Sequence, residues 1–263
     1  MTAASLLVRG RAGEVLADLD IVDIHGHVGT YDFCVPVHTP QSMAAAMDRV
    51  GVRQIFVSHY ACITGRMEAG NDETLAAIRA CPGRFLGYVI LWPDSADAVA
   101  RETRRRLAEG FSGIKLHNTN GFPYSEPAYV PALELADEHC MPVLLHTWGE
   151  PEVFAQVRQL GAKYPRASFL LGHSGIANPE EYIRIAREVP NVYLETCSSL
   201  FPYGLMDRLI DGAGAEKVVW GSDGGFINTP HQLGKILGAR CDDAAKRQVL
   251  SANARRILGA IRR

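Results

Sequence analysis

Four histidines and one aspartate follow or end short apolar stretches of this chain: His25, His27, His146, His173 and Asp223. Alternate side chains of an extended strand lie on the same face, so His25 and His27 can bind one cation together. Imidazole nitrogens combined with a carboxylate oxygen are typical ligands of Zn²⁺, and also of Mn²⁺ or Fe²⁺. A single histidine is more often a hydrogen-bonded core residue, but this combination of ligand types predicts a metal site.

Apolar stretches of this kind recur along the whole chain, and a segment with helical signals follows each of them. They cover residues 21–27, 54–59, 85–92, 113–117, 142–146, 168–173, 191–196 and 217–223. Stretches such as 143–145 are continuously apolar, as in parallel strands that are covered on both faces. Eight strand–helix units predict an α/β fold, a closed (β/α)8 TIM barrel in preference to an open doubly wound sheet. Active sites of such barrels lie at the carboxyl ends of the strands, where the five residues would meet.

Composition predicts one intracellular domain that covers residues 1–263, because no linker-like or low-complexity tract divides the chain. The 27 basic and 29 acidic residues nearly balance, which argues against binding to nucleic acid or to a membrane surface. The run Arg104-Arg105-Arg106 is therefore expected to be a solvated helix face. Six scattered cysteines indicate reduced thiols and a cytoplasmic location. The absence of a long apolar stretch argues against a membrane span.

Several motifs at the strand ends resemble those of a known family. They are Asp23-Ile24-His25-Gly26-His27, Gly113-Ile114-Lys115-Leu116-His117, His146, Gly172-His173-Ser174-Gly175 and Gly221-Ser222-Asp223. They resemble the amidohydrolase superfamily, and most closely its amidohydrolase-related branch, the aminocarboxymuconate-semialdehyde-decarboxylase-like enzymes. The resemblance extends from Ile21 to Gly259 and is specific for fold and metal, but not for substrate.

The resemblance implies that His25, His27, His146 and Asp223 hold a catalytic divalent metal, with Zn²⁺ expected first and Mn²⁺ or Fe²⁺ as alternatives. His173 would lie beside the ion and polarise the substrate or water, or bind a second ion. In binuclear relatives a fourth-strand lysine, here Lys115, is carboxylated and bridges two metals.

Otherwise Lys115 stays an ammonium that binds a substrate carboxylate or pairs with Glu195. We favour one ion over two on the number of available ligands. Barrels of this family often pair, so a homo-oligomer is also expected.

Other residues at the strand ends are candidates for contact with a small-molecule substrate, or for support of the residues that make it. They are His59, Trp92, His117, Trp148 and Glu195. Tyr31, Asp32 and His38 follow the first strand in a loop that is long enough to form part of a lid.

The sequence predicts a hydrolase that uses a metal-activated water to cleave a small amide, lactone or ester. Asp223 would move the proton, while His173 and Lys115 would stabilise the oxyanion. The alternative is a non-oxidative decarboxylase of a small aromatic or enoic acid. Such decarboxylases tend to carry a cap for which this chain leaves little room, so hydrolysis is ranked first. A third hypothesis, a barrel that only binds, is disfavoured by the intact set of ligands.

Overall fold

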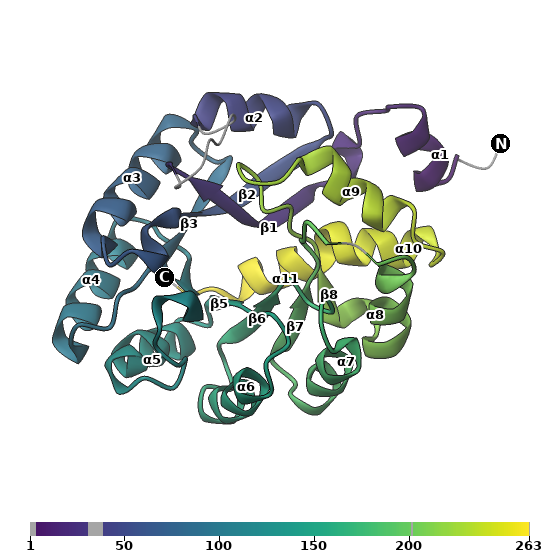
Figure 1. Ribbon diagram of the computed structural model, residues 1–263. Helices are drawn as coiled ribbons and strands as arrows, with labels where there is room; N and C mark the ends of the chain where they lie inside the picture. Colours follow the sequence, from purple (N-terminus) through teal and green to yellow (C-terminus); the bar gives the residue numbers. More distant parts are fainter. Residues whose placement is uncertain (1–3, 31–38, 201, 263) are drawn as a thin grey trace.

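The computed structural model describes residues 4–30, 39–200 and 202–262, in which eight parallel strands follow one another around a barrel (Figure 1). The strands are β1 Ile21–Val28, β2 Val52–His59, β3 Phe85–Ile90, β4 Gly113–Leu116, β5 Pro142–His146, β6 Ser168–Gly172, β7 Val192–Glu195 and β8 Val218–Val219. Their order in the sheet is their order in the chain, so the predicted (β/α)8 TIM barrel is confirmed. The proposed lid residues Tyr31, Asp32 and His38 lie outside the described residues.

Helices surround the barrel and cover the outer face of the sheet (Figure 1). They are α1 Leu6–Arg11, α2 Pro40–Asp48, α3 Met67–Ala80, α4 Ala96–Ala108, α5 Val130–Glu138, α6 Pro151–Lys163, α7 Pro179–Glu188, α8 Leu205–Ala213, α9 Thr229–Leu237, α10 Asp243–Arg247 and α11 Asn253–Ala260. Thr39 and Ser95 begin α2 and α4 by accepting hydrogen bonds from backbone N–H groups three residues later. Within the described ranges, no helix combines the length and the apolar character needed to cross a membrane.

The interior of the barrel is closed at the base by α11, which lies across the barrel in Figure 1. Ala254 and Ile257 of α11 pack against inward-facing apolar side chains from seven strands, namely Val22, Ile24, Phe56, Tyr88, Leu144, Leu170, Tyr193 and Val219. This plug excludes water from the base of the barrel. The open end is therefore the end at which the strands finish, where the candidate residues lie.

Strand β8 is shorter than the predicted stretch 217–223, because the chain leaves the sheet after Val219. The segment after Val219 stays hydrogen-bonded to β1, since Ile24 N donates to Trp220 O at 3.2 Å and Asp223 N donates to His25 O at 2.7 Å. Asp223 itself has a φ of 56°, in the left-handed region. This bend brings the Asp223 carboxylate next to His25 and His27 at the end of β1.

The arginine run on α4 is only partly a solvated face. Arg104 and Arg105 are exposed, as predicted, but Arg106 is fully buried. Its guanidinium is paired with Glu102 at 2.5 Å and Asp72 at 2.7 Å. The prediction was wrong for Arg106 because it considered the like charges of the run and neither Glu102, one turn earlier on α4, nor Asp72 on α3.

Candidate active site

His25, His27 and Asp223 converge at the open end of the barrel. Asp223 Oδ1 is 3.0 Å from His27 Nε2 and 3.6 Å from His25 Nε2. One ligand atom from each of the three buried residues lies within 4.8 Å of the others. Metal–ligand bonds of about 2.0–2.2 Å place the ligand atoms of one ion roughly 3–4 Å apart. The spacing therefore suits a single cation.

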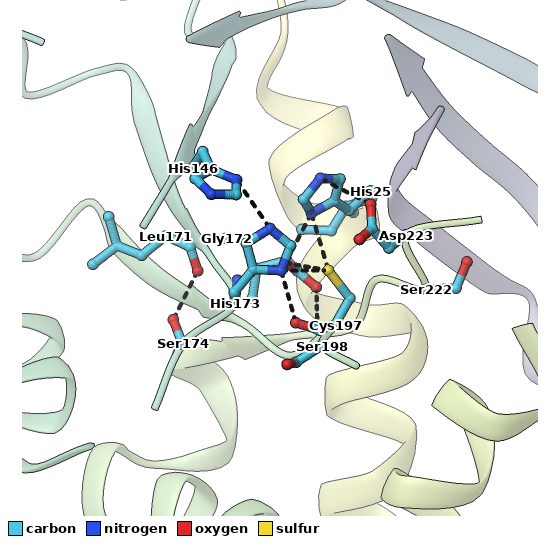
Figure 2. Close-up of polar contacts among 12 residues, drawn as sticks. His25, His146, Leu171, Gly172, His173, Ser174, Cys197, Ser198, Ser222 and Asp223 are labelled. Carbon is cyan, nitrogen blue, oxygen red and sulfur yellow. Dashed lines mark hydrogen bonds and ion pairs between the residues drawn. The ribbon is translucent and has the colours of Figure 1, made fainter. Parts of the chain in front are cut away.

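His146 lies beside this group and is paired with His173. His146 Nδ1 is 3.1 Å from His173 Nε2, and Figure 2 shows the contact between the two rings. His117 stacks on His146 with ring centroids 3.8 Å apart. The structure thus brings three of the four predicted ligands, His25, His27 and Asp223, into one group. The fourth, His146, lies next to this group and contacts His173.

Two of these residues adopt strained backbone conformations. His173, with a φ of 60°, directly follows β6, and Asp223, with a φ of 56°, lies four residues after the end of β8. A residue with a side chain pays a conformational cost in this left-handed region, and such strain is concentrated at functional sites. Both residues are among those that the sequence selected for chemistry, although Asp20, Cys140 and Asn178, outside the site, also have positive φ angles.

The charge states of these residues fit a divalent cation. Burial and the neighbouring Lys115 lower the pKa of His25, and burial also lowers the pKa of His146 and His173. Burial alone would raise the pKa of Asp223, but the electrostatic interaction with His25 and the hydrogen bond from His27 lower it below its usual range. Neutral imidazoles and an ionised carboxylate are the forms that bind metal ions.

Lys115 and Glu195 are fully buried beneath the group, on either side of His25. Lys115 Nζ is 3.2 Å from His25 Nε2, and Glu195 Oε2 is 2.9 Å from His25 Nδ1. Burial lowers the pKa of Lys115. Glu195, a sequence candidate for substrate contact, is absent from the described lining of the cavity and contacts His25 instead.

A cavity of about 370 Å³ opens above the group. It is lined by His27, Tyr60, Cys62, Ile63, His117, Thr119, His146, Trp148, His173, Ser199, Asp223, Phe226 and Ile227. His117 and Trp148 thus face it, as the sequence suggested. Tyr60, Trp148 and Phe226 contribute aromatic rings to its walls: Tyr60 stacks on His27 at 4.7 Å and Trp148 on His173 at 5.1 Å between centroids.

Two candidates for substrate contact are engaged elsewhere. His59 Nε2 lies 3.0 Å from Glu73 Oε2, and His59 Nδ1 accepts from Ala61 N at 2.9 Å. Trp92 packs edge-on against Phe122. Neither His59 nor Trp92 lines the cavity in the described part of the chain, and Tyr60, the residue after His59, faces it instead. Tyr60, Phe226 and Cys197 were not selected from the sequence; they lie one to three residues beyond the apolar stretches 54–59, 217–223 and 191–196.

The amidohydrolase family model matches residues 22–260. The chain belongs to the amidohydrolase family. The resemblance seen in the sequence motifs is thereby confirmed. Family membership and the group formed by His25, His27 and Asp223 together support a divalent-metal centre in this amidohydrolase.

Solved structures share the fold of this amidohydrolase at low sequence identity. A 2,6-dihydroxybenzoate decarboxylase from Rhizobium matches with a TM-score of 0.74 and 18% identity, over 91% of this chain and 98% of that chain. A dihydroxybenzoic acid decarboxylase from Polaromonas, with bound manganese and an inhibitor, matches with a TM-score of 0.73 and 17% identity, over 91% and 96%.

A third structure, from Pseudomonas putida, is provisionally named a 2-pyrone-4,6-dicarboxylic acid hydrolase. It matches with a TM-score of 0.70 and 19% identity, over 92% of this chain and 98% of that chain. Among curated protein sequences, none matches this chain significantly. At identities this low, the structural matches establish only the shared fold, and the reaction has to be inferred from the residues of the site.

Proposed function

We propose that this amidohydrolase is a metal-dependent decarboxylase of small, hydroxy-substituted aromatic acids. The observation that carries the proposal is the cavity of about 370 Å³, which has aromatic walls and a floor of histidines and one aspartate. This volume is near the lower end of the roughly 300–1,000 Å³ of small-molecule sites, which favours a single-ring substrate. Flat aromatic walls suit a planar ring, and the polar floor suits its oxygen substituents.

The sequence favours hydrolysis over decarboxylation, because a chain of 263 residues leaves little room for the cap expected of decarboxylases. The likeness to the Rhizobium decarboxylase extends over 98% of that chain. No large terminal region of that protein therefore lies outside the match, which weakens the argument from length.

We propose that one divalent ion is held by His25, His27 and Asp223, with His146 as the fourth ligand. The manganese in the Polaromonas structure supports Mn²⁺ as well as Zn²⁺ as a candidate. Such an ion supplies Lewis acidity, which lowers the pKa of a hydroxyl group or water beside it. His173 stays available to the substrate because its ring faces the cavity.

The ionised Asp223 carboxylate has the proton-transfer role in this proposal. It accepts the proton of the substrate hydroxyl and returns it to the ring carbon that bears the carboxylate. The bond from that carbon to the carboxylate then breaks, CO₂ leaves, and the bonding electrons restore the aromatic ring. The phenolate product takes one proton from water, which completes the overall consumption of one proton per CO₂ released.

Hydrolysis of a lactone or another small ester is the second candidate, and the ionised Asp223 carboxylate is equally suited to it. An ionised carboxylate can also accept a proton from water as the water attacks a carbonyl carbon. The Pseudomonas putida structure, with its hydrolase name, supports this possibility.

Assays on the metal-loaded full chain separate the two reactions. We expect CO₂ release from hydroxybenzoates that carry a hydroxyl group next to the carboxylate, loss of this activity after chelation, and recovery with Mn²⁺ or Zn²⁺. The matched controls are benzoates with the hydroxyl group at the distant ring position. Ring opening of lactones without CO₂ release from any benzoate would overturn the decarboxylase proposal in favour of hydrolysis.

The Lys115→Met variant tests the number of ions and the role of the lysine. We expect one ion per chain in the wild-type protein and in the variant, and a loss of roughly 10²-fold in kcat/KM as a buried cation beside the reacting groups is removed. Elemental analysis and steady-state kinetics measure the two quantities. Two ions in the wild-type protein and fewer in the variant would instead indicate that Lys115 is a carboxylated, bridging ligand.

A further inference from the structure

His25 belongs to two clusters of potential metal ligands at once. Its Nε2 side faces His27 and Asp223, whereas its Nδ1 side faces His173, Glu195 and Cys197. In the second cluster, Glu195 Oε2 is 2.9 Å from His25 Nδ1 and 3.0 Å from Cys197 Sγ. These are hydrogen-bond distances, and the backbone N–H groups of His173 and Cys197 also donate to the Glu195 carboxylate. The second cluster is therefore a hydrogen-bond network.

Glu195 determines where His25 carries its proton. Oε2 of Glu195 accepts from the backbone N–H of His173 at 3.2 Å, and Oε1 accepts from the backbone N–H of Cys197. A carboxylate that is already oriented by two backbone donors acts as the acceptor for the third contact, so His25 Nδ1 donates. A neutral imidazole has only one N–H, and His25 Nε2 therefore keeps its lone pair on the side of Asp223.

The backbone carbonyl of Cys197 has the same effect on two further rings. His173 Nδ1 lies 3.1 Å from Cys197 O, which can only accept, so His173 carries its proton on Nδ1. The neutral His173 then accepts at Nε2, where His146 Nδ1 is 3.1 Å away. His146 donates in this contact and keeps a lone pair on its own Nε2. Figure 2 shows this chain from Cys197 through His173 to His146.

Close packing holds the Glu195 carboxylate in place. A Cβ at Gly221 would lie 2.5 Å from Glu195 Oε1 and 2.7 Å from His25 Cβ. A Cβ at Gly172 would lie 2.8 Å from Leu145 O. Real Cβ contacts are not this short, so both positions next to the pair require glycine.

We propose that Glu195 and the carbonyl of Cys197 fix the tautomers of His25, His173 and His146, so that each ring has its proton on Nδ1 and a lone pair on Nε2. Glu195 is then a positioning residue that acts through His25. The consequence for metal binding rests on the proposed function, but the tautomers themselves are a property of the metal-free chain. Losing a partner of this kind typically costs 10–100-fold in metal affinity.

Nitrogen-15 NMR of the histidine side chains, recorded on the metal-free full chain, tests the proposal directly. We expect the Nδ1–H tautomer for His25, His146 and His173 in the wild-type protein, with each ring assigned by single histidine variants. In the Glu195→Gln variant, either the amide oxygen or the NH₂ group can face His25. We therefore expect the preference of His25 for the Nδ1–H tautomer to weaken. Affinity for Mn²⁺ and Zn²⁺, measured by equilibrium dialysis, should fall about 10–100-fold.

A matched control is Glu73→Gln, which changes a carboxylate–imidazole contact of 3.0 Å at His59, outside the cavity lining. It should leave the affinity unchanged. An Nε2–H tautomer at His25 in the wild-type protein would overturn the proposal, and so would a folded Glu195→Gln variant with unchanged tautomer and affinity. If the wild-type chain binds no ion, the proposed function fails, while the wild-type spectrum still decides the tautomers.

Discussion

Replacing Asp223 by Asn is expected to reduce turnover about 10³-fold, within the range of 10²–10⁴-fold that a positioned acid or base contributes. The Asp223 carboxylate is kept ionised by His25 and His27, so it can accept a proton from a substrate hydroxyl or from water. An amide cannot do this near neutral pH. The expected loss is the same for decarboxylation and for hydrolysis, because both reactions pass a proton through this residue.

Asn is the matched replacement at this position for two reasons. The φ of 56° at residue 223 lies in the left-handed region, which Asn tolerates as well as Asp does. The Asn side-chain oxygen can also remain a metal ligand, so the ion content is expected to fall less than the turnover. Kinetics and elemental analysis on the same preparation measure both quantities. Full activity at normal ion content would show that Asp223 does not move the proton.

The sequence predicted the barrel and the position of its open end because these depend on repeated local patterns. Continuous apolar stretches predicted strands that are buried on both faces, and β5 has the predicted bounds, Pro142–His146. Alternation along β1 predicted that His25 and His27 would share a face, and both lie within reach of Asp223. The three residues are far apart in sequence, but the order of the strands around the barrel brings the ends of β1 and β8 together.

How deeply each candidate side chain is buried could not be predicted from such local patterns. Glu195 and Trp148 both stand at the ends of strands in the sequence, yet Glu195 is fully buried and Trp148 is 39% exposed. Whether such a residue faces substrate or supports another side chain depends on contacts between strands that no local pattern encodes. His59 illustrates the same point, since its two ring nitrogens are engaged by Glu73 and Ala61.

Replacing His27 by Ala is expected to remove the bound ion and to reduce turnover by at least about 10³-fold. A Lewis-acidic ion contributes several kcal/mol to such reactions, and each 1.36 kcal/mol corresponds to a factor of ten. His27 is preferable to His25 for this test. His25 is fully buried between Lys115 and Glu195, and its removal would leave those two groups without their partner. His27 lines the cavity, so water can fill the space that Ala leaves.

The matched control is His231→Ala, because His231 is exposed on α9 and lies outside the cavity lining. Elemental analysis should give one ion per chain for the wild-type protein and the control, and close to none for His27→Ala. Thermal unfolding of the three metal-free proteins checks that the variants fold. A His27→Ala protein that retains a full ion and normal turnover would contradict the proposed metal centre, because the ion would then not depend on the group formed by His25, His27 and Asp223. Loss of the ion in His27→Ala alone would place the cation between β1 and β8, next to Asp223, the carboxylate for which we propose the proton-transfer role.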